Sequence, residues 1–112
     1  EVIDATSYMT DTTIKTAYIA QKSNAYQIEF YLSKSENGAK AGYEQYVANL
    51  KAVAGTDSKK NTTVTKDTYS KYTDKAGDYY SVVVRIDKTY LYVRANTSYE
   101  KEINTILEGL GY

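Results

Sequence analysis

The feature that most constrains this chain is a pair of alternating segments joined by only two residues. Segment 78–86 (DYYSVVVRI) and segment 89–95 (TYLYVRA) each carry an apolar side chain at every second position, the period of a β-strand. Only Asp87 and Lys88 lie between them, which is the length of a tight hairpin turn. The two segments are therefore predicted to pair as antiparallel strands.

Four further segments show strand patterns of differing strength. The strongest is 25–33 (AYQIEFYLS), which alternates cleanly, and the weaker ones are 13–21, 62–73 and 1–6. Residues 21–24 have the length and turn chemistry of a second hairpin connection. Residues 56–61 (TDSKKN) are polar and are predicted to form a loop.

Two segments carry helical spacing instead. Ser33 or Ser35 would begin the first helix and Gly55 would end it. Its apolar stripe consists of Ala39, Tyr43, Tyr46, Val47, Leu50 and Val53. A capping box of Thr97 and Glu100 is predicted to open the second helix. The second stripe consists of Tyr99, Ile103, Ile106, Leu107 and Leu110.

Together these elements predict an α+β fold in the order β-β-β-α-β-β-β-α. Hairpins imply an antiparallel sheet, and two one-sided helices are expected to pack on one face of it. Residues 1–112 have room for one hydrophobic core, so they are expected to form a single domain. Because the chain opens at Glu1 without an initiator Met, we expect it to be truncated at the N-terminus.

Composition excludes several classes of function. The chain has no Cys and no His, so zinc, haem and iron–sulfur ligation and Ser-His or Cys-His catalysis are not expected, and no cofactor is predicted. Lys plus Arg equals Asp plus Glu at 14 each, which argues against a nucleic-acid partner. No apolar run is long enough to span a membrane.

Carboxylates offer only weak candidates for chemistry. The sequence DKAGD (74–78) resembles a metal loop but lacks the other carboxylates of an EF-hand, so a solvated turn is expected. Glu29 and Asp87 lie on or beside strong strands, where a catalytic carboxylate pair is one interpretation and a solvated sheet face is the other.

The 14 tyrosines, set against one Phe and no Trp, are the most distinctive feature of the composition. Five lie on predicted core stripes: Tyr26, Tyr43, Tyr46, Tyr80 and Tyr99. The opposite strand positions predict an open sheet face that carries Tyr31, Tyr79, Tyr90, Tyr92, Arg85 and Arg94. One interpretation is a ladder of tyrosines that stabilises the sheet.

The other interpretation is a surface that binds a ligand or a partner, because Tyr side chains combine a large apolar area with a polar tip. In that case Arg85 and Arg94 could clamp a carboxylate or phosphate with paired hydrogen bonds. Alternatively, the two arginines would pair with Glu29 or Asp87 across the strands.

Two segments resemble small exported domains of Gram-positive, gut-type bacteria, a lipoprotein-type family of unassigned function. They are IKTAYIAQKSNAYQIEFYLS and YYSVVVRIDKTYLYVRANTSYEKEINTILEGLGY, the second ending in Leu-Gly-Tyr. The resemblance implies an α+β domain on the outer side of the cytoplasmic membrane, with a lipid anchor upstream of Glu1 and a helix lost before it. It brings no catalytic residues to this chain.

Three functions follow as hypotheses. The first is a non-enzymatic, secreted or lipid-anchored binding domain that uses the tyrosine-rich face for a protein, peptide or glycan at the cell envelope. The second is a hydrolase or lyase that depends on carboxylates and tyrosines. The third is a passive structural module of a larger envelope protein.

Overall fold

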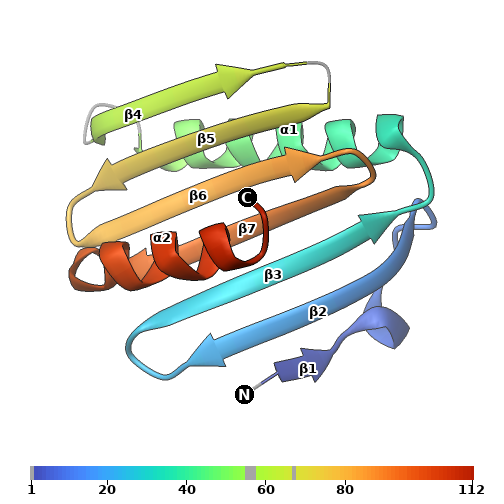
Figure 1. Ribbon diagram of the computed structural model, residues 1–112, viewed down its shortest axis with the longest axis horizontal. Coiled ribbons are helices and arrows are strands. Elements are labelled where there is room, and N and C mark those ends of the chain that lie inside the picture. Colours follow the sequence, from blue (N-terminus) through green and yellow to red (C-terminus); the bar gives the residue numbers. More distant parts are fainter. Residues whose placement is uncertain (1, 55–57, 67) are drawn as a thin grey trace.

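A single seven-stranded antiparallel sheet forms the centre of the molecule, in the order β1-β2-β3-β7-β6-β5-β4 (Figure 1). The computed structural model describes residues 2–54, 58–66 and 68–112. Its strands are β1 (Val2–Asp4), β2 (Ile14–Lys22), β3 (Tyr26–Ser33), β4 (Ser58–Thr65), β5 (Tyr69–Ala76), β6 (Tyr79–Ile86) and β7 (Thr89–Asn96). Its helices are α1 (Glu36–Ala54) and α2 (Glu100–Gly109). The predicted α+β class is confirmed.

The second half of the chain contains one strand more than predicted. Segment 62–73 was expected to be a single strand preceded by a loop, but β4 and β5 divide this region and pair with each other. The order is therefore β-β-β-α-β-β-β-β-α. Strand β4 is polar because it lies at the edge of the sheet, where it needs no apolar pattern. Positions 56–57 of the predicted loop lie outside the described residues.

Two hairpin turns occur where the sequence predicts them, and the third lies at the C-terminal end of the predicted turn 74–78. Asp87 adopts a left-handed conformation (φ 52°) between β6 and β7, and Asn24 (φ 60°) does so between β2 and β3. The turn between β5 and β6 is centred on Gly77 (φ 60°). Asp74 lies within β5 and is buried, so DKAGD is neither a metal loop nor a fully solvated turn.

Helix α1 carries the chain from the middle of the sheet to its far edge. It leaves β3 and leads into β4, which lies four strand positions away, so it crosses β7, β6 and β5 on one face (Figure 1). Four spacings of about 4.8 Å make about 19 Å, a distance that a 19-residue helix of about 28 Å spans obliquely. The chain then returns strand by strand until β7 pairs with β3.

Helix α2 lies on the opposite face of the sheet, which contradicts the prediction that both helices share one face (Figure 1). Two cores result. The core under α2 contains Ile28, Tyr80, Val82, Val84, Leu91, Val93, Ala95, Ile103 and Leu107. The core under α1 contains Ala5, Ala17, Tyr31, Ala39, Tyr43, Tyr72, Val83 and Tyr90.

The predicted helix ends are partly confirmed. Of the two predicted N-cap residues, Ser35 is the one that caps α1: its hydroxyl accepts a hydrogen bond from the Gly38 amide at 3.0 Å. The Thr97–Glu100 capping box is wrong, because Asn96 accepts the Ser98 amide instead and opens a short 3₁₀ turn before α2. The Val53 side chain and Gly55 lie outside the described residues.

Neither helix in the described part of the chain is both long and apolar enough to cross a membrane.

Candidate functional site

The six residues predicted to share a sheet face do share one, but that face is not fully open. Tyr31, Tyr90 and Arg85 form one cross-strand row, and helix α1 buries all three. The prediction that they are exposed is wrong because the crossover from β3 to β4 places α1 over them. Tyr79, which is 50% exposed, and Arg94 lie beyond the helix and remain accessible.

Four aromatic rings pack together where α1 meets the sheet, and we call Tyr31, Tyr46, Tyr90 and Tyr92 the tyrosine cluster. Tyr31 stacks on Tyr90 with ring centroids 4.8 Å apart. Tyr46, which projects from α1, stacks on Tyr92 at 4.7 Å and so joins the helix to the sheet. Each such pair contributes about 0.5–1.5 kcal/mol beyond the area it buries. The cluster is thus part of the core under α1, whereas the ladder interpretation expected its strand members on an uncovered sheet face.

A carboxylate at the edge of the tyrosine cluster collects three hydrogen bonds. Tyr31 and Tyr46 donate their hydroxyls to Glu29 Oε1 at 2.5 and 2.6 Å. The Gln27 side-chain amide donates to Glu29 Oε2 at 3.1 Å. The strand pattern did not indicate this role for Glu29, because Tyr46 reaches the carboxylate from α1, 17 residues further along the chain.

Burial raises the pKa of several cluster hydroxyls. It raises the pKa of Tyr90 to about 12. For Tyr31 and Tyr46, burial is the largest cause and the hydrogen bond to Glu29 is the second, and the pKa of both rises well above its ordinary value. Ionisation of either hydroxyl would place a second negative charge beside the Glu29 carboxylate.

We therefore expect the free energy of unfolding to fall above pH 10. Tyrosines of the unfolded chain lose their protons near pH 10, whereas the cluster keeps its protons in the folded state, so the unfolded state binds fewer protons. The stabilisation is complete below pH 10 and is lost as the pH rises through 12, by about 1.4 kcal/mol per pH unit for each retained proton. Urea unfolding at a series of alkaline pH values measures the slope. Tyr46→Phe should make the slope shallower, and a flat profile would contradict this account.

Arg85 has a structural role that excludes the predicted pair of clamping arginines. Its side chain is 3% exposed, and Nη2 donates to the Lys66 carbonyl and to the Ser70 hydroxyl, both at 3.1 Å. Ser70 is its cross-strand neighbour on β5. A ligand in solvent cannot reach this guanidinium, so only Arg94 remains of the proposed clamp.

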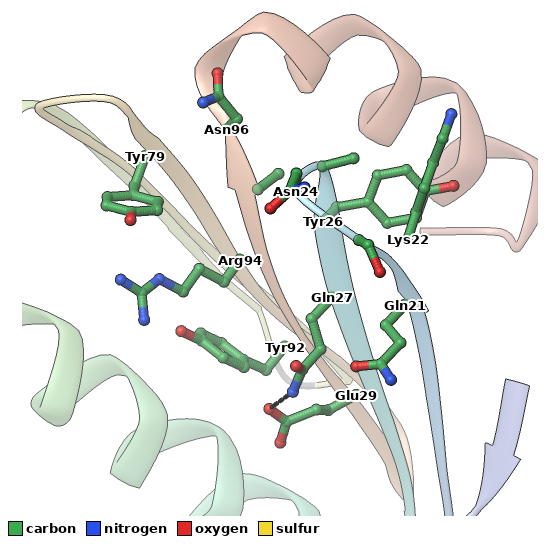
Figure 2. Close-up of a pocket in the computed structure, with 13 residues that line it drawn as sticks. Gln21, Lys22, Asn24, Tyr26, Gln27, Glu29, Tyr79, Tyr92, Arg94 and Asn96 are labelled. Carbon is green, nitrogen blue, oxygen red and sulfur yellow. Dashed lines mark hydrogen bonds between the residues drawn. The ribbon is translucent and has the colours of Figure 1, made fainter. Parts of the chain in front are cut away.

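An open groove lies on the α1 face beyond the end of the tyrosine cluster (Figure 2). It has a volume of about 690 Å³ and lies between the β2–β3 hairpin and the ends of β6 and β7. Arg94 and Tyr79 form one side, with the guanidinium carbon 4.3 Å from the centre of the ring. Tyr92, Gln27 and Glu29 form the floor (Figure 2). Arg94 points away from the sheet, between the rings of Tyr79 and Tyr92 (Figure 2).

A second hollow lies on the other side of the tyrosine cluster. It has a volume of about 570 Å³ and is bounded by the segment from Met9 to Ile14 and by the first half of α1. Tyr31, Tyr46 and Tyr90 line it as well. The cluster and its hydrogen bonds to Glu29 thus separate the two hollows.

The described residues include no group of three or more Asp or Glu side chains that could hold a metal ion. Comparison of the chain with protein-family models, with curated proteins and with solved structures found no match.

Proposed function

We propose that this chain is a non-enzymatic, extracytoplasmic binding domain whose ligand occupies the open groove. The observation that supports this most is the exposed guanidinium of Arg94, held against the Tyr79 ring beside a rigid aromatic floor. The contact with the ring restrains the guanidinium, so less freedom is lost when a ligand binds. The groove volume falls within the range of small-molecule binding sites.

The tyrosine ladder alone does not account for this arrangement. Packing explains the tyrosine cluster, which is largely buried and hydrogen-bonded within the protein. It does not explain Tyr79, which keeps half of its surface exposed at the end of a strand. Exposed aromatic and Arg side chains are enriched where proteins bind other molecules. A purely structural module would gain from this exposed pair only the cation–π contact itself, about 0.5–1 kcal/mol.

The geometry favours binding over hydrolysis. Among the described residues that line the groove, Glu29 is the one carboxylate, and its two oxygens already accept hydrogen bonds from three side chains. Glycoside hydrolysis ordinarily requires two carboxylates on either side of the bond that breaks. The raised pKa of Tyr31 and Tyr46 also makes these hydroxyls poor bases at neutral pH.

Tyr79→Ala and Tyr18→Ala form a matched pair that tests the site. Tyr79 lies in the groove and is 50% exposed, whereas Tyr18 lies on the opposite sheet face and is 41% exposed. The ¹⁵N-labelled chain is titrated with a panel of neutral sugars, acidic sugars and tripeptides while amide chemical shifts are recorded. Binders are expected to shift amides around the groove. Tyr79→Ala should weaken their binding about tenfold, and Tyr18→Ala should leave it unchanged.

Three results would contradict the proposal. Binders could shift amides elsewhere, no member of the panel could bind at millimolar concentration, or a bound member could be cleaved or otherwise converted. The location outside the cytoplasm stays a prediction from composition and resemblance. Fractionation of the source cells tests it, and recovery of the protein in the cytoplasmic fraction would contradict it.

A further inference from the structure

We infer that the open groove selects a saccharide that bears a carboxylate, with Arg94 binding the carboxylate. This inference rests on the proposed function and names the chemical class of its ligand.

Arg94 carries a charge that its own neighbours do not neutralise. It lies against the ring of Tyr79 and beside Tyr92, and none of the ion pairs among the described residues includes it. Glu29, the carboxylate of the same groove, accepts its hydrogen bonds from Tyr31, Tyr46 and Gln27. A guanidinium that is exposed and held against an aromatic ring, without a hydrogen-bonded anion beside it, is suited to receive one from solution.

The contact with Tyr79 leaves the N–H groups of the guanidinium available. The guanidinium carbon lies 4.3 Å from the centre of the ring, a cation–π contact that does not use those N–H groups as hydrogen-bond donors. Those N–H groups can bind the two oxygens of a carboxylate side by side. Arg94 extends outward between Tyr79 and Tyr92, so its edge is accessible to a ligand in the groove (Figure 2).

The shape of a carboxylate suits Arg94, because its two coplanar oxygens match the parallel N–H groups of the guanidinium. Lys22, a second exposed cation, also lines the groove. The Glu29 carboxylate is held by hydrogen bonds from Tyr31, Tyr46 and Gln27. The two cations therefore favour an acidic ligand over a neutral one.

The remainder of the lining resembles a surface for hydroxyl groups more than one for a peptide. Gln27 offers its carbonyl oxygen after its NH₂ group has bound Glu29, and Asn96 offers its NH₂ group after its carbonyl has accepted Ser98. Such amides suit ligands that both donate and accept hydrogen bonds, as sugar hydroxyls do. The exposed ring of Tyr79 and the ring of Tyr92 supply the apolar surface that a sugar ring packs on.

A peptide that joins the sheet as an extra strand is disfavoured here. The groove lies over β3, β7 and β6, which all have partners on both sides in the sheet. Strand addition needs an unpaired edge. A peptide would therefore have to bind through side chains alone, in a groove whose lining is mainly polar.

The test uses trigalacturonate and its methyl ester, in which an uncharged methyl ester replaces each carboxylate. Binding is measured by calorimetry and by amide chemical shifts of the ¹⁵N-labelled chain. We expect trigalacturonate to bind at least about tenfold more tightly than the ester. Arg94→Gln should remove that preference, and Arg94→Lys, which keeps the charge without the paired geometry, should restore only part of it. Lys101→Gln, an exposed charge on α2, is the control and should have no effect.

Several outcomes separate failure of this inference from failure of the proposed function. If the ester or neutral sugars shift the groove amides as strongly as trigalacturonate, or if Arg94→Gln keeps the preference, the groove still binds but the carboxylate assignment is wrong. Tighter binding of glucose 6-phosphate, or of a tripeptide with a free carboxylate, would overturn the assignment in favour of that class. If no probe shifts the groove amides, both proposals are wrong. An amide spectrum of Arg94→Gln that matches the parent apart from local shifts confirms that the variant is folded.

Discussion

Gly42→Val is expected to lower the free energy of unfolding by about 3 kcal/mol, close to the upper end of overpacking effects. A Cβ atom at Gly42 would lie 2.6 Å from Cε1 of Tyr90 and 2.7 Å from its hydroxyl oxygen, and closer still to Cζ. The Tyr90 ring cannot move aside easily, because it is buried and stacked on Tyr31. Valine has only a slightly better helix propensity than glycine, so little of this cost is offset.

The close approach of α1 to the sheet at Gly42 is what this variant tests. Gly109→Val is the matched control, because a Cβ there meets no atom within 4 Å, and it should change stability by less than about 0.5 kcal/mol. Urea unfolding followed by circular dichroism measures both variants. A loss below about 1 kcal/mol for Gly42→Val would mean that α1 can lift from the tyrosine cluster at little cost, which contradicts the packing described here.

Leu107→Ala should cost about 2–5 kcal/mol, whereas Leu110→Ala should cost less than about 0.5 kcal/mol. The two leucines lie three positions apart, in α2 and at its C-terminal cap, but Leu107 is 1% exposed and Leu110 is 58% exposed. Truncation of Leu107 leaves a cavity between α2 and the face that carries Val82, Val84 and Leu91. Truncation of Leu110 removes atoms that already contact water.

The leucine pair also tests which face α2 covers. Both leucines belong to the stripe predicted from helical spacing, so the sequence pattern expects similar losses for the two. Unfolding experiments on both variants under identical conditions provide the comparison. Similar losses would contradict the observed orientation of α2, while a small loss for Leu107→Ala would show that α2 is only loosely attached to the sheet.

The central hairpin and both helices could be predicted from sequence because their patterns are local. The pairing of β6 with β7 follows from the alternation in 78–86 and 89–95 and from the two-residue turn at Asp87 and Lys88. The structure contains this pairing. The faces covered by the helices could not be assigned in the same way. Val82, Val83 and Val84 form a continuous apolar run, which is typical of a strand buried on both sides. That run was the available sign that both faces of the sheet are covered.

Strand β4 was missed for a different reason. An edge strand needs neither an apolar face nor clean alternation, so its polar sequence is similar to that of a loop. Its formation depends on the hydrogen bonds that β5 offers to it. Such pairing is a property of the folded sheet and leaves little trace in the composition of the strand itself.

The candidate site was predicted in part. The two-residue alternation of side chains along the strands correctly places six residues on one side of the sheet: Tyr31, Tyr79, Tyr90, Tyr92, Arg85 and Arg94. The alternation could not show which of these six residues are covered and which are accessible, because that depends on the path of α1. The role of Glu29 was also hidden, since Tyr46 reaches it from a helix that follows β3 in the chain.

The pairing of β3 with β7 has a consequence for how the chain folds. Strands β1 to β3 and strands β4 to β7 each form a meander of neighbouring hairpins, which need only short loops to close. The β3–β7 ladder joins these two meanders, and α1 together with β4, β5 and β6 lies between its strands in the chain. Bringing β3 and β7 together therefore has the largest loop-closure entropy of any pairing in the sheet. We therefore expect the meeting of the two meanders to be the slow step of folding, and the tyrosine cluster and the groove to form only when that step is complete.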